Sequence, residues 1–324
     1  MRSRRLLSSK LALSVLALLL SSCTLVQVNL GPSRKPLTET TVMGQGRAKV
    51  VLIDISGVLL EDNLGEGFLP WSGGAGLLDR LAEELTLAEE DEDVEALLVR
   101  IDSPGGSVSA SDLIYHQLEA HKAETGHKIV VCLMGLAASG GYYTALAGDR
   151  ILAIPTATTG SIGVISLKLN LAGLMDRYGI QAETIKSGTH KDMWSLFRPA
   201  DESEKAIMQS LIDDFFDRFK ELVREKRSGM DPEQFKTAFD GRIMSAAQAL
   251  ELGLVDGLAY PEEAFDAAKK LAGVEEARLV AYHRPGARRS NIYAGTEGGR
   301  GSVSALPIPS PGPRLMYLWL PGVR

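Results

Sequence analysis

Three apolar runs separated by helical patterns are the feature that most constrains the fold of this chain. The runs at 49–59, 94–102 and 127–135 read KVVLIDISGVL, VEALLVRID and HKIVVCLMG, and each suits a strand buried on both faces. Between them, residues 77–90 place leucines at helical spacing with acidic residues opposite, and a second helical segment covers 113–124. Strand and helix in alternation predict parallel βαβ units and an α/β fold.

The same alternation continues to about residue 285. Asp201, followed three residues later by Glu204, has the pattern of a capping box and predicts the start of a long helix. We therefore assign a globular domain to 47–285, between an irregular tether at 23–46 and a tail at 286–324. The tail is rich in Gly, Ser and Pro, which predicts disorder, but its last ten residues, LMYLWLPGVR, are too apolar for a pure linker.

The N-terminus has the layout of a secretory signal. Arginines and a lysine precede an apolar run at 11–20, which ends in LSSC. This ending resembles a bacterial lipobox, so we expect residues 1–22 to be removed and Cys23 to carry a lipid. The alternative is an uncleaved anchor helix, because 11–33 carries no charge and a spanning helix needs about 20 apolar residues. Both interpretations export the protein and tether it to a membrane.

The charge and the cysteines exclude several functions. The chain has a net charge of −6, and loss of the basic N-terminus would make it more acidic, which argues against a nucleic-acid surface. Apart from Cys23, Cys132 is the only cysteine, so no disulfide framework is possible. We expect Cys132 to be a small buried apolar residue within its strand.

The stretch MGLAASGGYY places Ser139 among alanines and glycines directly after the third apolar run. At a turn from strand to helix, its hydroxyl would lie beside amide groups with partial positive charge. Such amides can bind the oxyanion that forms when a nucleophile attacks a carbonyl, and Gly140 and Gly141 would let a peptide backbone come close. The alternative is a small-residue turn packed for its own sake, because short motifs often match by chance.

A nucleophilic serine needs a base, and histidine is the usual one. The chain has five histidines: His116, His121, His127, His190 and His283. The first two fall on a charged amphipathic helix and the third in a turn, where we expect solvent-facing side chains. His190 and Lys191 lie together in the polar stretch KSGTHKDMW, and either could serve. A lysine can act as a base where desolvation and nearby positive dipoles lower its pKa.

Three stretches together resemble the bacterial signal peptide peptidase A (SppA) family, which are serine peptidases of family S49. They are GLAASGGYYTALAGDRILAIPTATTGSIGVI, IKSGTHKDM and DGRIMSAAQALELGLVDGLA, in the order of the family. The resemblance covers about residues 49–272 and implies a Clp protease/crotonase-like fold. It further implies that Ser139 is the nucleophile and Lys191 the general base of a Ser–Lys dyad, and that Lys186 is not the catalytic lysine.

The resemblance also assigns roles to the surrounding residues. Ser161 in TGSIG corresponds to the serine that holds the lysine amine, and the stretch SPGG resembles the family's oxyanion loop. The amides of Gly106 and Gly140 would then bind the oxyanion. We expect Tyr142 and Tyr143 to pack the helix beneath Ser139.

Because the chain contains one such unit, it resembles the short members of the family, which close into rings. We therefore expect a homo-oligomeric ring. In some rings of the family the lysine reaches the serine of the neighbouring subunit, so a dyad within one chain and a dyad between two subunits both remain open. The implied protein is a membrane-tethered serine endopeptidase on the extracytoplasmic side of the cell envelope. It would cleave apolar peptides, such as signal-peptide remnants, through an acyl-enzyme, without a metal or another cofactor.

Three other functions remain open at this point. The first is a catalytically inactive ring that organises membrane proteins, which the joint presence of Ser139, Lys191, Ser161 and Gly106 disfavours. The second is a capsid-maturation peptidase, and the third is a crotonase-like acyl-CoA enzyme. The export signal disfavours both, since coenzyme A is cytoplasmic.

Overall fold

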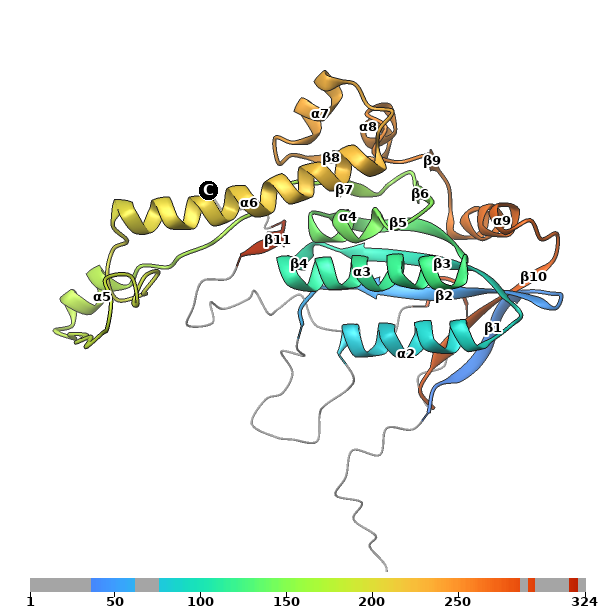
Figure 1. Cartoon of the computed structure of the whole chain (residues 1–324), viewed down its shortest axis with the longest axis horizontal. Helices are drawn as coiled ribbons and strands as arrows, with labels where there is room; N and C mark the ends of the chain where they lie inside the picture. The colour runs from blue at the N-terminus through green and yellow to red at the C-terminus, as the bar shows by residue number, and fades with distance from the viewer. Residues whose placement is uncertain (1–35, 62–75, 286–290, 295–314, 320–324) are drawn as a thin grey trace, which may run out of the picture. The chain divides into compact units, whose positions relative to one another are not determined.

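The computed structural model describes residues 36–61, 76–285, 291–294 and 315–319 (Figure 1). The predicted signal at 1–22 and Cys23 lie outside these residues. No helix in the described ranges has the length and apolar character needed to cross a membrane.

A mixed sheet forms the centre of the domain. Its path runs β1-β10-β2-β3-β5-β6-β9. From β10 to β9, each strand runs parallel to the next one along this path, whereas β1 runs antiparallel to β10. The strands of the path are β1 (Thr38–Gly44), β2 (Ala48–Ser56), β3 (Val94–Ser103), β5 (Lys128–Ala138), β6 (Arg150–Ala153), β9 (Gly257–Leu258) and β10 (Ala277–His283). The three apolar runs of the sequence are therefore the neighbouring parallel strands β2, β3 and β5, which confirms the predicted α/β fold.

The central strands are buried on both faces, as their continuous apolar sequences predict. In β2, Val51 and Ile53 contribute to one hydrophobic cluster while Val50 and Leu52 contribute to another. The first cluster includes residues of α2 (Leu77–Glu90) and α3 (Val108–Thr125), which lie side by side in Figure 1. The second includes residues of α9 (Pro261–Ala272). Because side chains alternate along a strand, the sheet has a separate core on each face.

The remaining elements follow the sheet or attach to its edge. The long helix α6 (Glu202–Lys226) begins at the predicted capping box. The Asp201 side chain accepts a hydrogen bond from the Glu204 amide, and the Glu204 side chain accepts one from the Asp201 amide. Strand β7 pairs with β5 and with β8. These elements are β4 (Gly105–Ser107), α4 (Gly140–Ala145), β7 (Thr158–Gly160), α5 (Ala172–Arg177), α6 (Glu202–Lys226), α7 (Pro232–Ala238), β8 (Ile243–Ser245), α8 (Ala246–Glu251) and β11 (Met316–Leu318).

Parts of the expected tether and tail belong to the folded unit. Strand β1, within the tether expected at 23–46, pairs antiparallel with β10 from Thr38 opposite His283 to Gly44 opposite Arg278. In the expected tail, the buried Arg100 guanidinium donates to the carbonyl oxygens of Ile292 and Ala294 and forms a 2.7 Å ion pair with Asp54. Strand β11 also falls in this tail. Strands β1 and β11 are held by backbone pairing with distant strands, and residues 291–294 are held by the Arg100 side chain. Contacts far away in the sequence, rather than local composition, therefore position these short segments.

The histidines of α3 differ from the expectation. His116 is exposed as predicted, but the prediction was wrong for His121, which is 4% exposed. The ring of His121 lies 3.1 Å from that of His127, Nε2 to Nδ1. Burial, together with the neighbouring His127, lowers the pKa of His121 to about 4. Both rings lie where α3 returns to β5, so tertiary packing covers a helix face that its sequence marks as polar.

Candidate active site

Ser139 lies at the sharp turn between β5 and α4 and is 1% exposed. Its backbone has φ 54° and ψ −116°, a combination that L-residues rarely adopt. Such a conformation costs roughly 1–3 kcal/mol, so the surroundings must hold it in place. The Ser139 amide donates to the Gly160 carbonyl at 2.8 Å, and its carbonyl accepts from the Tyr143 amide at 2.8 Å. The expected turn from strand to helix is present, and its strain is typical of turns that present a nucleophile.

The glycines after Ser139 are required by packing. A Cβ atom at Gly140 would lie 2.3 Å from Ser111 Oγ, and one at Gly141 would lie 2.8 Å from the Ser103 carbonyl oxygen. The first turn of α4 therefore lies directly against β3, β4 and α3. The sequence had suggested that these glycines make room for a peptide, and the structure adds a second reason for them.

The two glycines of the SPGG stretch begin β4, which lies against the start of α4. A Cβ atom at Gly105, where φ is +95°, would lie 2.7 Å from the Gly140 amide nitrogen. On one edge of β4, Leu59 accepts from the Ser107 amide at 2.8 Å and donates to the Gly105 carbonyl at 2.9 Å. Because polar groups alternate along a strand, the N–H and C=O of Gly106 face the opposite edge. The two expected oxyanion donors, Gly106 and Gly140, thus belong to backbone segments in contact.

Ser161 follows β7 and is joined to the turn at Ser139 through the backbone. Its neighbour Gly160 accepts the hydrogen bond from the Ser139 amide and pairs with Ala138 of β5. Ser161 itself is 9% exposed, has φ 51°, and donates its amide to the Arg242 carbonyl at 2.6 Å. Ser139 and Ser161 therefore occupy consecutive parts of one rigid framework.

Lys191 lies in a different environment. It is exposed, and its amide donates to the Gly188 carbonyl at 3.4 Å. Within the residues that the structure describes, no hydrogen bond or ion pair joins the Lys191 amine to Ser139 or Ser161. By contrast, Lys186 forms a 2.5 Å ion pair with Asp192. One chain thus brings together the expected nucleophile, the oxyanion donors and Ser161, but it does not connect them to the expected base.

Tyr142 and Tyr143 pack beneath the turn, as expected. Both side chains are almost fully buried, and the Tyr142 hydroxyl donates to the Leu254 carbonyl at 2.7 Å. Cys132 is also buried and has a free thiol, as expected. Burial raises the pKa of the Cys132 thiol to about 12, so the thiol is a poor nucleophile.

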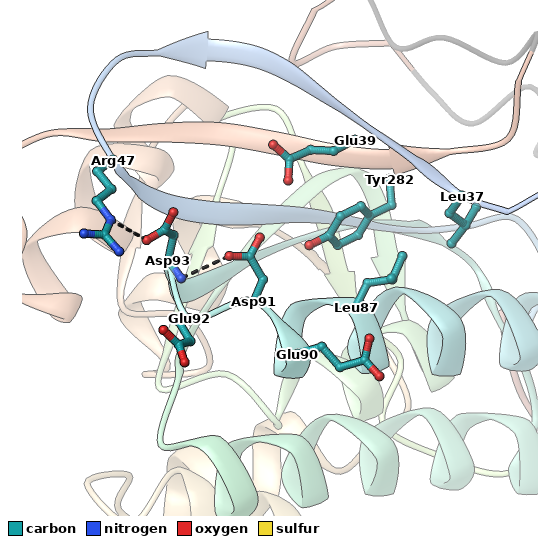
Figure 2. A pocket seen from close by; sticks show the side chains of 9 residues that line it. All are labelled: Leu37, Glu39, Arg47, Leu87, Glu90, Asp91, Glu92, Asp93 and Tyr282. Atoms are coloured by element: carbon teal, nitrogen blue, oxygen red, sulfur yellow. Dashed lines mark hydrogen bonds and ion pairs between the residues drawn. The ribbon is translucent and has the colours of Figure 1, made fainter.

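A pocket elsewhere on the domain contains none of these residues. Figure 2 shows it beside β1 and the end of α2, with several carboxylates at its rim. Lys49 bonds to Glu39 at 2.9 Å and to Asp91 at 2.6 Å, and Arg47 bonds to Asp93 at 2.7 Å. These ion pairs neutralise Glu39, Asp91 and Asp93 at the rim, and the pocket contains none of the site residues that the sequence predicts.

Comparison with known proteins identifies the framework around Ser139. Residues 121–275 match peptidase family S49, and residues 74–160 match the Clp protease family. A candidate signal peptide peptidase SppA of Enterococcus faecium is 35% identical over 75% of this chain and 70% of its own length. A candidate protease of Methanocaldococcus jannaschii is 34% identical over 74% of this chain and 75% of its own.

The chain belongs to peptidase family S49. Its Clp protease/crotonase-like fold follows from the family and from the arrangement of the sheet. The sequence motifs predicted the family and the fold, and both predictions are confirmed. The chloroplastic serine protease SPPA of Arabidopsis thaliana is 29% identical over 77% of this S49 chain, but the match covers only 37% of that relative. In the present chain, the S49 match covers one segment, residues 121–275.

The sequence motifs missed one component beside the S49 framework. Strand β11, from the end of the chain, pairs antiparallel with β4 on the edge opposite Leu59. The apolar character of LMYLWLPGVR was the only sequence signal that this segment docks on the domain.

Proposed function

We propose that the chain is a serine endopeptidase in which Ser139 is the nucleophile and Lys191 the general base. Ser139 Oγ attacks the substrate carbonyl carbon while its proton passes to the lysine amine, which then protonates the leaving amine. Water hydrolyses the resulting ester with the same base, and the amides of Gly106 and Gly140 stabilise each oxyanion. The strained Ser139 turn, held against these two glycine segments, is the observation that carries this proposal.

We further propose that the base comes from a neighbouring subunit of a homo-oligomeric ring. Lys191 is exposed and has no contact with Ser139 among the described residues of one chain. The same region carries large apolar side chains that are each more than a third exposed, and exposed apolar surface of this kind is typical of subunit contacts. They are Leu174, Tyr178, Ile180, Ile185, Phe197, Ile207 and Leu211. In such a ring, Ser161 would hold the incoming lysine amine.

The proposed substrates are apolar peptides such as signal-peptide remnants, cleaved at the extracytoplasmic side of the cell envelope. The lipobox-like LSSC sequence supports a lipid anchor on Cys23, which is a proposal from sequence alone. Labelled fatty acid should enter the wild-type protein but not Cys23→Ser. A mature protein that still begins near Met1 would contradict this anchor.

A fluorophosphonate probe with peptide mapping tests the nucleophile. We expect one label, on Ser139, and none in Ser139→Ala. A folded oligomer that takes no label would support the inactive scaffold instead.

Mixing two inactive variants tests where the base comes from. When Ser139→Ala and Lys191→Ala chains assemble together, a dyad shared between subunits restores wild-type sites at random, up to about a quarter of all sites. A dyad within one chain would give no restoration. Refolding the two variants separately and then combining them without subunit exchange provides the control.

A further inference from the structure

The turn that carries Lys191 is bound internally by charged groups. It covers 186–198 and lies beyond the N-terminal end of α6, away from the sheet (Figure 1). Asp192, the residue after Lys191, is the centre of its contacts. The Asp192 carboxylate accepts from the Lys186 amine at 2.5 Å, from Arg198 Nη2 at 2.8 Å and from Arg198 Nε at 3.1 Å. Two cations at hydrogen-bond distance hold this carboxylate in one orientation.

Arg198 binds a second carboxylate with its other edge. Arg198 Nη1 donates to Glu204 Oε2 at 3.1 Å, and Arg198 Nη2 donates to Glu204 Oε1. Glu204 is the third residue of α6, is 0% exposed, and also accepts from the Asp201 amide at 3.2 Å in the capping box. Two bidentate contacts on one side chain need the planar guanidinium of arginine, which lysine lacks. We call Asp192, Arg198 and Glu204 the arginine clamp.

The clamp is charged at neutral pH. The pKa of Asp192 lies well below its ordinary value, because Arg198 and then Lys186 bind the ionised carboxylate. Arg198 likewise lowers the pKa of Glu204. Loss of the arginine would leave the buried Glu204 carboxylate without its cation, which is strongly unfavourable. The arginine therefore joins the turn of Lys191 to the first turn of α6.

Further contacts tie this turn to the extended segment before α5. The Lys168 amine donates to the Arg198 carbonyl at 3.0 Å and lies 5.7 Å from the centre of the Trp194 ring. The Leu171 amide donates to the Leu196 carbonyl at 2.8 Å. Trp194 has φ 63°, which is rare for a bulky residue and persists only where the surroundings hold it. The turn thus has a fixed shape although much of its surface is exposed.

The Lys191 amine takes no part in these contacts. In the described part of the chain, Lys191 forms one hydrogen bond, from its amide to the Gly188 carbonyl, and no ion pair joins its amine to the adjacent Asp192. Because Lys186 and Arg198 bind that carboxylate, the Lys191 amine remains available to another group. A general base needs this combination of a fixed backbone and a free amine.

We propose that Arg198 is a positioning residue for the catalytic lysine. By binding Asp192 and Glu204 at once, it fixes the backbone of Lys191 to the start of α6. It also keeps the neighbouring carboxylate away from the lysine amine. This inference rests on the proposed function of Lys191 as general base. It deepens that function, because α6 carries part of the proposed subunit contact, so a subunit that packs on α6 would meet the lysine at a set position.

Steady-state kinetics of the full chain test the clamp when turnover is divided by the number of sites that a fluorophosphonate probe labels at completion. Arg198→Ala should lower kcat per labelled site about tenfold to a hundredfold with KM nearly unchanged, because the base is misplaced while substrate binding is not touched. Arg198→Lys should recover little, since an ammonium group cannot bind two carboxylates bidentately. Fewer labelled sites with wild-type turnover at each would show a role in folding alone and overturn the inference.

Glu204→Gln separates the clamp from the helix cap. A glutamine here still accepts the hydrogen bond of the capping box but binds the guanidinium more weakly, so kcat should fall by less than in Arg198→Ala. The double variant should be no slower than Arg198→Ala, because both changes break one unit. Additive losses would contradict a single clamp. Arg47→Ala, which breaks the ion pair with Asp93 outside this turn, is the control and should keep its kcat.

Mixed oligomers show which member of the dyad the clamp serves. In the mixture of Ser139→Ala and Lys191→Ala chains, Arg198→Ala in the chain that supplies Lys191 should lower the restored activity about tenfold or more. The same change in the chain that supplies Ser139 should have little effect. Equal losses in the two arrangements would indicate a general structural role and overturn the positioning of the lysine.

The Lys191→Ala variant distinguishes failure of the clamp from failure of the proposed function. If Lys191→Ala is inactive while Arg198→Ala keeps its full kcat, the clamp alone is overturned. If Lys191→Ala remains active, the proposed base is wrong, and the clamp is overturned with it.

Discussion

Ser139 and Lys191 lie in regions of opposite character. The turn at Ser139 is buried, bonded to β7 and packed against glycines that tolerate no side chain. The region around Lys191 consists of short turns and α5, with exposed apolar residues such as Tyr178 and Ile185. The contacts of the first region all come from the same chain, whereas the second region exposes apolar side chains of the kind found at subunit contacts. Under the proposed function, folding would therefore position the nucleophile, and assembly would supply the base.

The largest effects should come from the two reacting groups. Ser139→Ala and Lys191→Arg should each lower kcat by about a thousandfold or more, because one removes the nucleophile and arginine cannot act as a base. Thermal unfolding of Ser139→Ala should change little, since only a hydroxyl is lost. His190→Ala is the control and should remain active. An inactive His190→Ala together with an active Lys191→Ala would replace the dyad by a histidine mechanism.

The next largest effect should come from Gly105→Ala, which tests the rigid region. Its Cβ would lie 2.0 and 2.7 Å from backbone atoms of Tyr317 and Gly140, so we expect a loss of about 1–3 kcal/mol in the free energy of unfolding. Displacement of the Gly140 amide should lower kcat about a hundredfold.

Gly126→Ala is the matched control. Gly126 also has a positive φ of +75°, but no neighbouring atom lies within 4 Å of the point that a Cβ would occupy. This variant should cost only about 1 kcal/mol and keep its activity. Similar kinetics for the two variants would show that the β4–α4 contact does not position the oxyanion donors.

A smaller effect is expected from Ile185→Ser, which tests the exposed region. The substitution should leave the thermal stability of the domain unchanged but shift sedimentation towards smaller species and lower specific activity about tenfold. Leu271→Ser, an exposed position on α9, should change neither property. Full activity of a monomeric Ile185→Ser protein would contradict assembly as the source of the base.

The smallest effect concerns the pH dependence of stability, and it comes from His121, which lies outside both regions. The folded-state pKa of His121 is about 4, below its ordinary value of 6.5, so the unfolded chain binds more protons between these values. Stability should be full above pH 6.5 and fall towards pH 4, as followed by urea unfolding. His121→Gln should flatten this slope, and His116→Gln should not.

The central strands β2, β3 and β5 were predictable because each carries a continuous apolar run, and local sequence is enough to identify such runs. The glycines and small residues around Ser139 likewise identified the turn before its geometry was known. Strand β1 was not predicted, since TETTVMG has little apolar periodicity and becomes a strand only by pairing with β10.

Long-range contacts account for the other differences. The burial of His121 depends on its approach to His127 at the start of β5, which the helical pattern of α3 does not encode. The docking of β11 depends on an open strand edge at β4, far away in the sequence. Among the described residues, no contact joins Lys191 to Ser139, so the fold of one chain does not supply the complete dyad that we propose.

The docked strand β11 also covers exposed backbone. It pairs with β4 on one side and with Ile165 on the other. Without it, both of these extended segments would present unpaired N–H and C=O groups, and open edges of this kind readily pair with other extended chains. Strand β11 therefore lowers the tendency of the folded domain to associate edge to edge.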